Sequence, residues 1–469
     1  MALENTIIWG FCGKNGKEIV FELRKKLNVT IWFSDQNNSI DICSLVQGVI
    51  PKTIVQNEND ILSFNEFYRQ HFLIYNIMIS RRGISFSNIH ELTNEFALAY
   101  YYFCKLVREQ KTSLVIFSNI PHEGPDYVLY QIAKIFCIKT LLCYQNILPN
   151  NFLISTSIKD FGGFHNIPAD LHNNEIVINF GSNQKLFYMQ DIVQQQDAHH
   201  AGGLHLYYYK IKIGINRIFS RLKIILQILT KSNQLNITNI LDNRNLRLRY
   251  EKQINQRALD NITVRKLLIN SKHIIYVPLH LQPELSTSAL GGVFQDQLYM
   301  IETLRSIFDK KWIILVKENP KQGAYQRGEL FFDRLDRIPG LYFVNKLFPS
   351  IEIIENVALT ATVTGTAGWE SIMLGRKCLT FGQAWYASMV NCLNYKPGLT
   401  QKDLSDFLSK EYEIEELRES FNKLANKSGL GVVDDLYSGI VSGYNEASNA
   451  GSVVRSLMAV INHPATVWA

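Results

Sequence analysis

A turn of small and hydroxylated residues between a buried strand and a helix is the part of this sequence best suited to bind phosphate. The apolar run 357–363 predicts the strand, and an apolar-periodic helix follows the turn and ends before Gly375. The turn consists of Thr364, Gly365, Thr366, Ala367 and Gly368. Such a turn presents backbone N–H groups and the positive end of a helix dipole to an anion. The alternative is an ordinary βαβ crossover whose glycines only allow close packing.

Two more loops at predicted strand ends carry polar and charged residues. The loop after strand 273–278 contains His280, Gln282 and Glu284, and the loop after strand 312–317 contains Lys317, Glu318, Asn319 and Pro320. Successive parallel strands present their carboxyl ends at one edge of a sheet, so we expect all three loops to converge. Lysine and helix-end amides neutralise phosphate, and Glu370 near the helix start can accept hydrogen bonds from ribose. Together these residues predict a nucleotide-sugar site.

A polar loop in the first half of the chain offers candidates for acid–base chemistry. His122 and Glu123 follow the predicted strand 113–118, where they suit a general base and its orienting partner, or a carboxylate base acting alone. The competing interpretation is structural: Asp126 caps the following helix and His122 is merely exposed.

The elements that must position these residues follow an alternating α/β pattern. In the first half, strands are predicted at 5–11, 29–33, 113–118 and 139–144, with helices at 17–27, 88–109 and 126–136. Gly10 and Gly13 lie where the first strand turns into the helix, but their spacing does not complete a dinucleotide fingerprint. The pattern predicts an α/β chain with two Rossmann-like, doubly wound domains. We divide it into an N-terminal domain (1–180), a helical connector (181–265), a C-terminal domain (266–420) and C-terminal helices (421–469).

Composition excludes several classes of protein. Hydrophobic residues make up 46% of the chain and charged residues 19%, and the net charge is only +6, without a basic tail. This argues against a dedicated nucleic-acid binder. The seven cysteines contain no C-x-x-C pair, and the adjacent His199 and His200 have no further ligands nearby, so we expect neither a metal site nor a disulfide framework. Without a secretion signal or a long uncharged apolar segment, the expected location is the cytoplasm.

Residues 206–231 mix apolar side chains with lysines and arginines at helical spacing. They predict a basic amphipathic helix. It either packs on the body of the protein with its lysines in water or docks on the anionic surface of the inner membrane.

These motifs resemble the bacterial capsule polysaccharide biosynthesis family, which includes Kdo transferases. The resemblance covers residues 272–390 and rests on the segments 276–284, 316–320 and 363–370, together with Asp296-Gln297, Phe381-Gly382 and Tyr386. It implies a GT-B glycosyltransferase whose two domains face a cleft, with no metal or other cofactor and with a nucleotide-sugar as co-substrate. The absence of a D-x-D motif agrees with this. Carried over to this chain, Lys317, Glu318 and Pro320 fall in the nucleotide-phosphate loop. Thr364 to Gly368 form the phosphate turn, Glu370 contacts ribose, and Gln282 and Glu284 line the sugar side.

The chain departs from the family at Asn319, where members usually carry histidine before the proline. Asparagine can donate a hydrogen bond but cannot carry charge or a proton, so either the donor is not CMP-Kdo, or His280 or Lys317 takes over the role of the histidine. We expect a glycosyltransferase acting on a surface polysaccharide or lipid-linked acceptor, with CMP-Kdo or another nucleotide-sugar as donor, and with His122, Glu123, Glu284 and His280 as catalytic candidates. The alternatives are a nucleotide-sugar epimerase of the same architecture and a non-catalytic scaffold of a capsule assembly complex.

Overall fold

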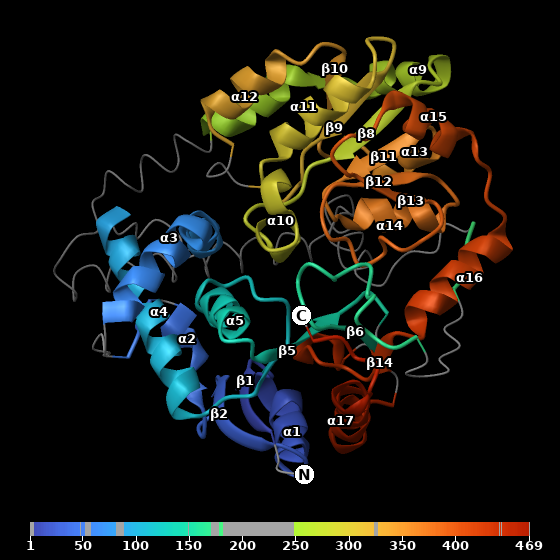
Figure 1. The fold of residues 1–469 in the computed structure, drawn as a ribbon. Helices are drawn as coiled ribbons and strands as arrows, with labels where there is room; N and C mark the ends of the chain where they lie inside the picture. Colours follow the sequence, from blue (N-terminus) through green and yellow to red (C-terminus); the bar gives the residue numbers. More distant parts are fainter. Residues whose placement is uncertain are drawn as a thin grey trace, which may run out of the picture. The chain divides into compact units, whose positions relative to one another are not determined.

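The structure, a computed structural model, contains two mostly parallel β-sheets with helices packed around them (Figure 1). It describes residues 4–46, 48–51, 58–80, 89–148, 150–169, 178–181, 248–322, 327–439, 441 and 443–468. Both sheets belong to one compact unit formed by residues 1–182 and 253–469. The predicted α/β class with two doubly wound, mostly parallel sheets is confirmed. The predicted connector falls largely outside the described residues, as do the amphipathic segment 206–231 and His199-His200.

The first sheet has seven strands in the order β14-β6-β5-β4-β1-β2-β3. Its strands are β1 (Asn5–Trp9), β2 (Asn28–Ser34), β3 (Ile40–Asp41), β4 (Leu114–Phe117), β5 (Lys139–Gln145), β6 (Asn151–Ser155) and β14 (Ser428–Leu430). The helices of this half are α1 (Gly13–Arg24), α2 (Ile42–Val46), α3 (Glu58–Ile79), α4 (Ile89–Glu109) and α5 (Pro125–Ile135). The central strand β4 is wholly apolar and buried, and β1 is buried from Thr6 onward, as expected of parallel strands covered on both faces.

The last part of the chain completes this first sheet. Strand β14 pairs antiparallel with β6, and α17 (Glu446–Asn462) packs against α1. A buried hydrogen bond of 2.8 Å from Asn449 Nδ2 to Asn15 Oδ1 joins the two helices. The remaining elements of this region are α15 (Gln401–Ser409), α16 (Ile414–Ala425) and the short 3-10 helix η4 (Asp435–Tyr437).

The second sheet is parallel throughout, in the order β13-β12-β11-β8-β9-β10-β7. Its strands are β7 (Ala258–Leu259), β8 (Ile274–Pro278), β9 (Ile313–Lys317), β10 (Leu341–Val344), β11 (Leu359–Thr362), β12 (Cys378–Thr380) and β13 (Cys392–Asn394). Its helices are α9 (Asn261–Asn270), α10 (Leu285–Ser288), η2 (Gly292–Gln295), α11 (Gln297–Ile307), α12 (Glu329–Asp336), α13 (Ser350–Glu355) and α14 (Thr366–Met373). Side chains of α9 and α13, including Val264 and Ile353, form a buried core with Tyr276 and Leu315 of the sheet.

Each sheet has a switch point, where the strand order reverses and the loops on either side leave in opposite directions. In the first sheet the switch point lies between β1 and β4, and in the second between β8 and β11. Open α/β sheets bind ligands at such points, outside the carboxyl ends of the strands. The topology therefore places the loops after β8 and β11 where a ligand site is expected.

Candidate functional site

The turn from β11 into α14 is held from below by threonine side chains. Gly365 N donates to Thr362 Oγ1 (3.1 Å), and Thr364 Oγ1 donates to the Ser286 carbonyl (2.8 Å) in the loop after β8. Helix α14 begins after Gly365. No side chain caps its first amides, and its first turn contains no acidic residue. The first amides of a helix have no intrahelical acceptor. The amides of Thr366 and Ala367 are therefore the donors that this turn can offer to an anion.

His280 joins the loop after β8 to this turn. Its Nε2 lies 2.8 Å from Thr362 Oγ1 and accepts the Thr364 N–H at 3.4 Å, so the proton resides on Nδ1, which faces Ser286 Oγ at 3.4 Å. Burial, together with the nearby Arg327 guanidinium, lowers the pKa of His280 to about 4. The ring is therefore neutral at pH 7. It fits a residue that positions the turn, and it carries no charge with which to replace the family's histidine.

Arg327 connects the loop after β8 to the loop after β9. Its Nε donates to Glu318 Oε2 (3.0 Å) in an ion pair whose side chains are 1% and 0% exposed. Its other nitrogens donate to Gln282 Oε1 and to the His280 carbonyl. With the contacts of His280 to the β11 turn, all three predicted loops are in contact with one another. Glu318 serves as a counter-ion, and both of its oxygens are engaged, because Oε1 accepts the Asn319 N–H (2.9 Å).

Arg327 is not among the residues predicted from the sequence. Arg327 lies beyond the motif segment 316–320, and only its contact with Glu318 reveals its role. The same applies to Gln297, which exchanges two hydrogen bonds with the backbone of His280 (2.7 and 3.2 Å). Neither position carries a sequence signal of its own, apart from Gln297 standing in a segment of the family resemblance.

Lys317 points into the protein and away from the loop that follows it. Its Nζ donates to Ser350 Oγ (2.7 Å) at the start of α13, and Tyr276 Oη reaches the same hydroxyl at 3.2 Å. Burial lowers the pKa of Lys317 to about 8, against the opposing effect of the nearby Glu370 carboxylate. Lys317 and Glu370 are both less than a tenth exposed, and the carboxylate lies close enough to act on the Lys317 ammonium electrostatically.

The remaining predicted donor residues lie nearer the surface. Asn319 Oδ1 accepts the Lys321 N–H (2.9 Å), so the asparagine shapes its own loop, and Pro320 is exposed. Gln282 shares hydrogen bonds with Gln322. Glu284 begins the short helix α10, where its N–H donates to Thr287 Oγ1 (3.3 Å).

We call the part of the chain built on the first sheet the first lobe and the part built on the second sheet the second lobe. In the first lobe, Asp126 organises the loop that contains the predicted base. Its buried carboxylate accepts the N–H groups of His122 (2.6 Å), Glu123 (2.8 Å) and Tyr127 (2.7 Å). The His122 ring donates Nδ1–H to the Ile120 carbonyl (2.7 Å), because a carbonyl can only accept. A backbone carbonyl, and not Glu123, therefore orients this ring. Nε2 is therefore the ring nitrogen that the Ile120 carbonyl does not engage.

The first lobe's own switch point carries carboxylates. The N–H of Gly13, at the start of α1, donates to Asp35 Oδ1 (3.1 Å). Partial burial pushes the pKa of Asp35 upward, but hydrogen bonds from Gln36, Gly13 and Ser34 outweigh it and lower the pKa below its ordinary value. Burial raises the pKa of the neighbouring Cys12 thiol, and the charges of Asp35 and Glu123 add to this effect. The edge is therefore acidic.

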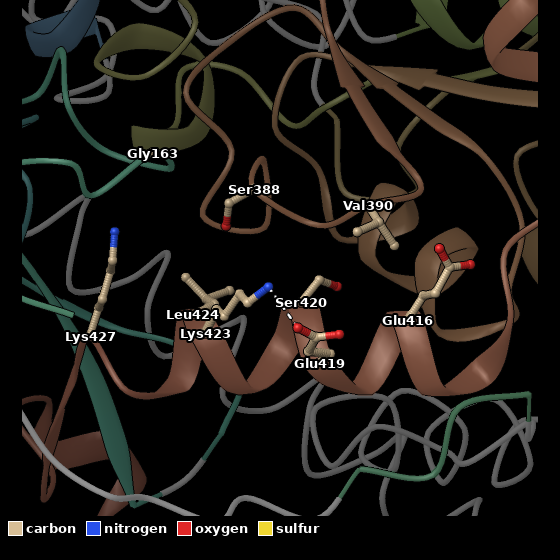
Figure 2. A pocket seen from close by; sticks show the side chains of 9 residues that line it. All are labelled: Gly163, Ser388, Val390, Glu416, Glu419, Ser420, Lys423, Leu424 and Lys427. Carbon is tan, nitrogen blue, oxygen red and sulfur yellow. Dashed lines mark ion pairs between the residues drawn. The ribbon is translucent and has the colours of Figure 1, made fainter. Parts of the chain in front are cut away.

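A cavity of about 330 Å³ lies apart from these loops, along α16 (Figure 2). Its lining residues are Gly163, Ser388, Val390, Glu416, Glu419, Ser420, Lys423, Leu424 and Lys427. Lys423 pairs with Glu419 (2.8 Å), and Lys427 donates to the Phe164 carbonyl (2.8 Å). No predicted site residue lines this cavity, and its charges are mixed. We therefore base no functional assignment on it.

Within the described ranges, no group of three or more histidine, cysteine, aspartate or glutamate side chains is placed to hold a metal ion. The helices in the same part of the chain include none that is both long and apolar enough to span a bilayer.

No family model and no curated protein matches the sequence. Among solved structures, the chain is similar to the KpsC β-Kdo 2,7 transferase of Thermosulfurimonas dismutans, at 11% identity and a TM-score of 0.28, over 69% of this chain and 89% of that one. It is similar to the UDP-GlcNAc 2-epimerase of Neisseria meningitidis, at 11% identity and a TM-score of 0.23, over 97% and 99%. A third is the glycotransferase of kitacinnamycin, at 10% identity and 0.23, over 96% and 98%. Because all three TM-scores lie below 0.5, we base the functional proposal on the geometry of the chain itself.

Proposed function

We propose that this chain is a glycosyltransferase that moves a sugar from a nucleotide-sugar donor to an acceptor hydroxyl. The observation that carries the proposal is the uncapped start of α14 at the switch point of the second sheet. Three interconnected loops hold this turn in place, and its amides suit the phosphate of a departing nucleotide. The acidic edge of the first lobe suits a neutral, hydroxyl-rich acceptor, since it repels a second anion.

The reaction needs a base that deprotonates the acceptor hydroxyl and donors that stabilise the leaving phosphate. His122 Nε2, with Glu123 as the alternative, takes the proton from the acceptor hydroxyl as its oxygen bonds to the anomeric carbon of the donor. The bond from that carbon to the phosphate oxygen breaks, and the amides of Thr366 and Ala367 stabilise the phosphate as its charge grows. Arg327 and His280 act by holding the loops in position.

The donor site is tested by removing one amide. Thr366→Pro eliminates the N–H at the first helical position, where proline is well tolerated, and the preceding Gly365 has the extended backbone (ψ 159°) that proline favours. Calorimetry with CMP-, UDP-, GDP- and CDP-linked sugars would identify a ligand of the parent chain. We expect Thr366→Pro to weaken its binding about tenfold, as for loss of one hydrogen bond to a charged group.

Asn261→Pro is the matched control. It changes the first position of α9, whose Asp260 cap uses the later amides of Ile262 and Thr263. This variant should bind the donor as the parent does. The proposal fails if none of the sugar nucleotides binds, or if Thr366→Pro binds as tightly as Asn261→Pro. Donor turnover without any acceptor would instead indicate an epimerase.

The finer assignment rests on the sequence resemblance. We infer a surface polysaccharide or lipid-linked acceptor, a Kdo-like donor sugar, independence from metal, and a cytoplasmic enzyme that meets the inner membrane through residues 206–231. Transfer from CMP-Kdo to an isolated capsule precursor, measured with EDTA present, tests donor, acceptor and metal independence together.

A further inference from the structure

Two cysteines lie side by side beneath the proposed phosphate turn. Cys378 of β12 and Cys392 of β13 are direct partners in the parallel register, and both are thiols. We propose that this pair is a modification site: the two thiols close reversibly to a disulfide by exchange with a small-molecule disulfide of the glutathione type, and closure loosens the turn.

The sheet brings the two side chains within bonding range. Neighbouring strands run about 4.8 Å apart, inside the Cα separation of about 4.4–6.8 Å that a disulfide needs. Paired residues also project to the same face of a sheet. Cys392 Sγ lies 4.0 Å from Thr380 Oγ1, two residues along β12 from Cys378. The Cys392 thiol therefore points to the face that carries Cys378.

The two thiols differ in access, which sets the order of the chemistry. Cys392 is partly exposed, whereas Cys378 is fully buried, and burial beside Cys392 raises the pKa of the Cys378 thiol. The Cys392 thiolate attacks one sulfur of the external disulfide and releases the first small thiol. Cys378 then loses its proton and attacks the Cys392 sulfur, releasing the second. The net change oxidises two cysteines and reduces one external disulfide to two thiols.

Packing connects Cys378 to the turn. A methyl group built on Gly368 would lie 2.9 Å from Cys378 Sγ and 2.2 Å from Tyr386 Oη. The Cys378 sulfur and the Tyr386 phenol are therefore packed directly against the backbone of the turn. The Tyr386 hydroxyl in turn donates to the Gly365 carbonyl. Drawing Cys378 Sγ toward β13 removes a contact from this packed group. Closure should therefore release the Tyr386 bond that fixes Gly365 and the amides after it.

Mass spectrometry of the full chain tests the site without any nucleotide. Both cysteines fall in one tryptic peptide, 378–402, because Lys396 precedes a proline. After oxidised glutathione and alkylation of the remaining thiols, this peptide should appear unalkylated and two hydrogen atoms lighter than the dithiol. Dithiothreitol should restore it. Amide exchange in residues 364–370 should become more than about tenfold faster on oxidation.

Cys392→Ser and Cys378→Ala are the matched variants, and each should remove both effects. Cys392→Ser is the safer one, because that side chain is only partly buried. A stable mixed disulfide on Cys392 beside an unmodified Cys378 overturns the proposal, as does closure without faster exchange at 364–370. The effect on donor binding rests on the proposed function and is measured separately. If exchange responds as expected but the reduced chain binds no sugar nucleotide, the proposed function fails and the modification site stands.

Discussion

The two switch points of this chain have the same topology but differ in charge. In the first sheet, the start of α1 already donates to the Asp35 carboxylate, Glu123 lies in the neighbouring loop, and the buried Asp126 lies in the first turn of α5. In the second sheet, the start of α14 has neither a capping side chain nor an acidic residue in its first turn, and the buried Glu318 of the neighbouring loop is already paired with Arg327. A helix start at a switch point is therefore not enough to make an anion site. A helix start is open to an external anion only where the chain does not place a carboxylate of its own there.

The largest expected effect on stability comes from breaking the buried Arg327–Glu318 ion pair, which joins the loops at the switch point of the second sheet. Arg327→Met leaves Glu318 buried without its partner, which should lower the free energy of unfolding by about 3–5 kcal/mol. Urea denaturation measures this. Arg418→Met is the matched control: it breaks the exposed pair with Glu415 (48% and 78% exposed) and should cost less than about 1 kcal/mol. Equal losses in the two variants would show that the buried pair has no special role.

A second change gives the start of α14 a carboxylate of its own, as Asp35 does at the start of α1. Thr366→Glu places a carboxylate in the exposed first turn of α14, where it satisfies the amides and the helix dipole. Helix stability should rise by about 0.3–1 kcal/mol, while sugar-nucleotide binding falls at least about tenfold. Calorimetry and thermal melts separate the two effects, with Thr366→Gln as the neutral control. Unchanged binding in Thr366→Glu would place the phosphate elsewhere.

The converse change removes the Asp35 carboxylate from the start of α1. Asp35→Ala leaves the Gly13 amide without its acceptor and should cost about 0.5–2 kcal/mol of stability, as for loss of a helix cap. The lowered pKa of Asp35 fixes the sign of the pH dependence. Its stabilisation is present above the ordinary aspartate pKa and disappears as the pH falls through the lower, folded value. The difference in unfolding free energy between parent and Asp35→Ala should therefore shrink in acid.

The smallest expected signal is the absence of a titration at His280. Its pKa of about 4 lies below the unfolded value of 6.5, so neutral His280 stabilises the fold above pH 6.5, and this stabilisation is lost as the pH falls toward 4. In NMR spectra of ¹³C-labelled histidine, assigned with His280→Gln, the ring carbon should not shift between pH 5.5 and 8. A midpoint near 6.5 would return His280 to the role of charged donor.

Sequence patterns were sufficient where structure depends on local periodicity. The apolar runs located β1, β4, β8, β9 and β11 to within about two residues, and strand direction alone predicted that the three loops meet.

What the sequence did not reveal depends on contacts between distant residues. Whether Lys317 points into the loop or toward Ser350 is a side-chain choice made by the packing of α13, which no periodicity encodes. Glu318 looked like a ligand because its partner, Arg327, carries no motif. The three-residue strand β14 is too short to show alternation, and it forms only because β6 provides an edge.

That late strand has a consequence for synthesis. Ser428 of β14 meets Asn151 of β6 across 277 positions of sequence. At about 5–20 residues per second, a ribosome needs roughly 14–55 s to make the intervening chain. Throughout that interval the nascent first lobe presents the open edge of β6, a template for wrong pairing, while the whole second lobe is being made.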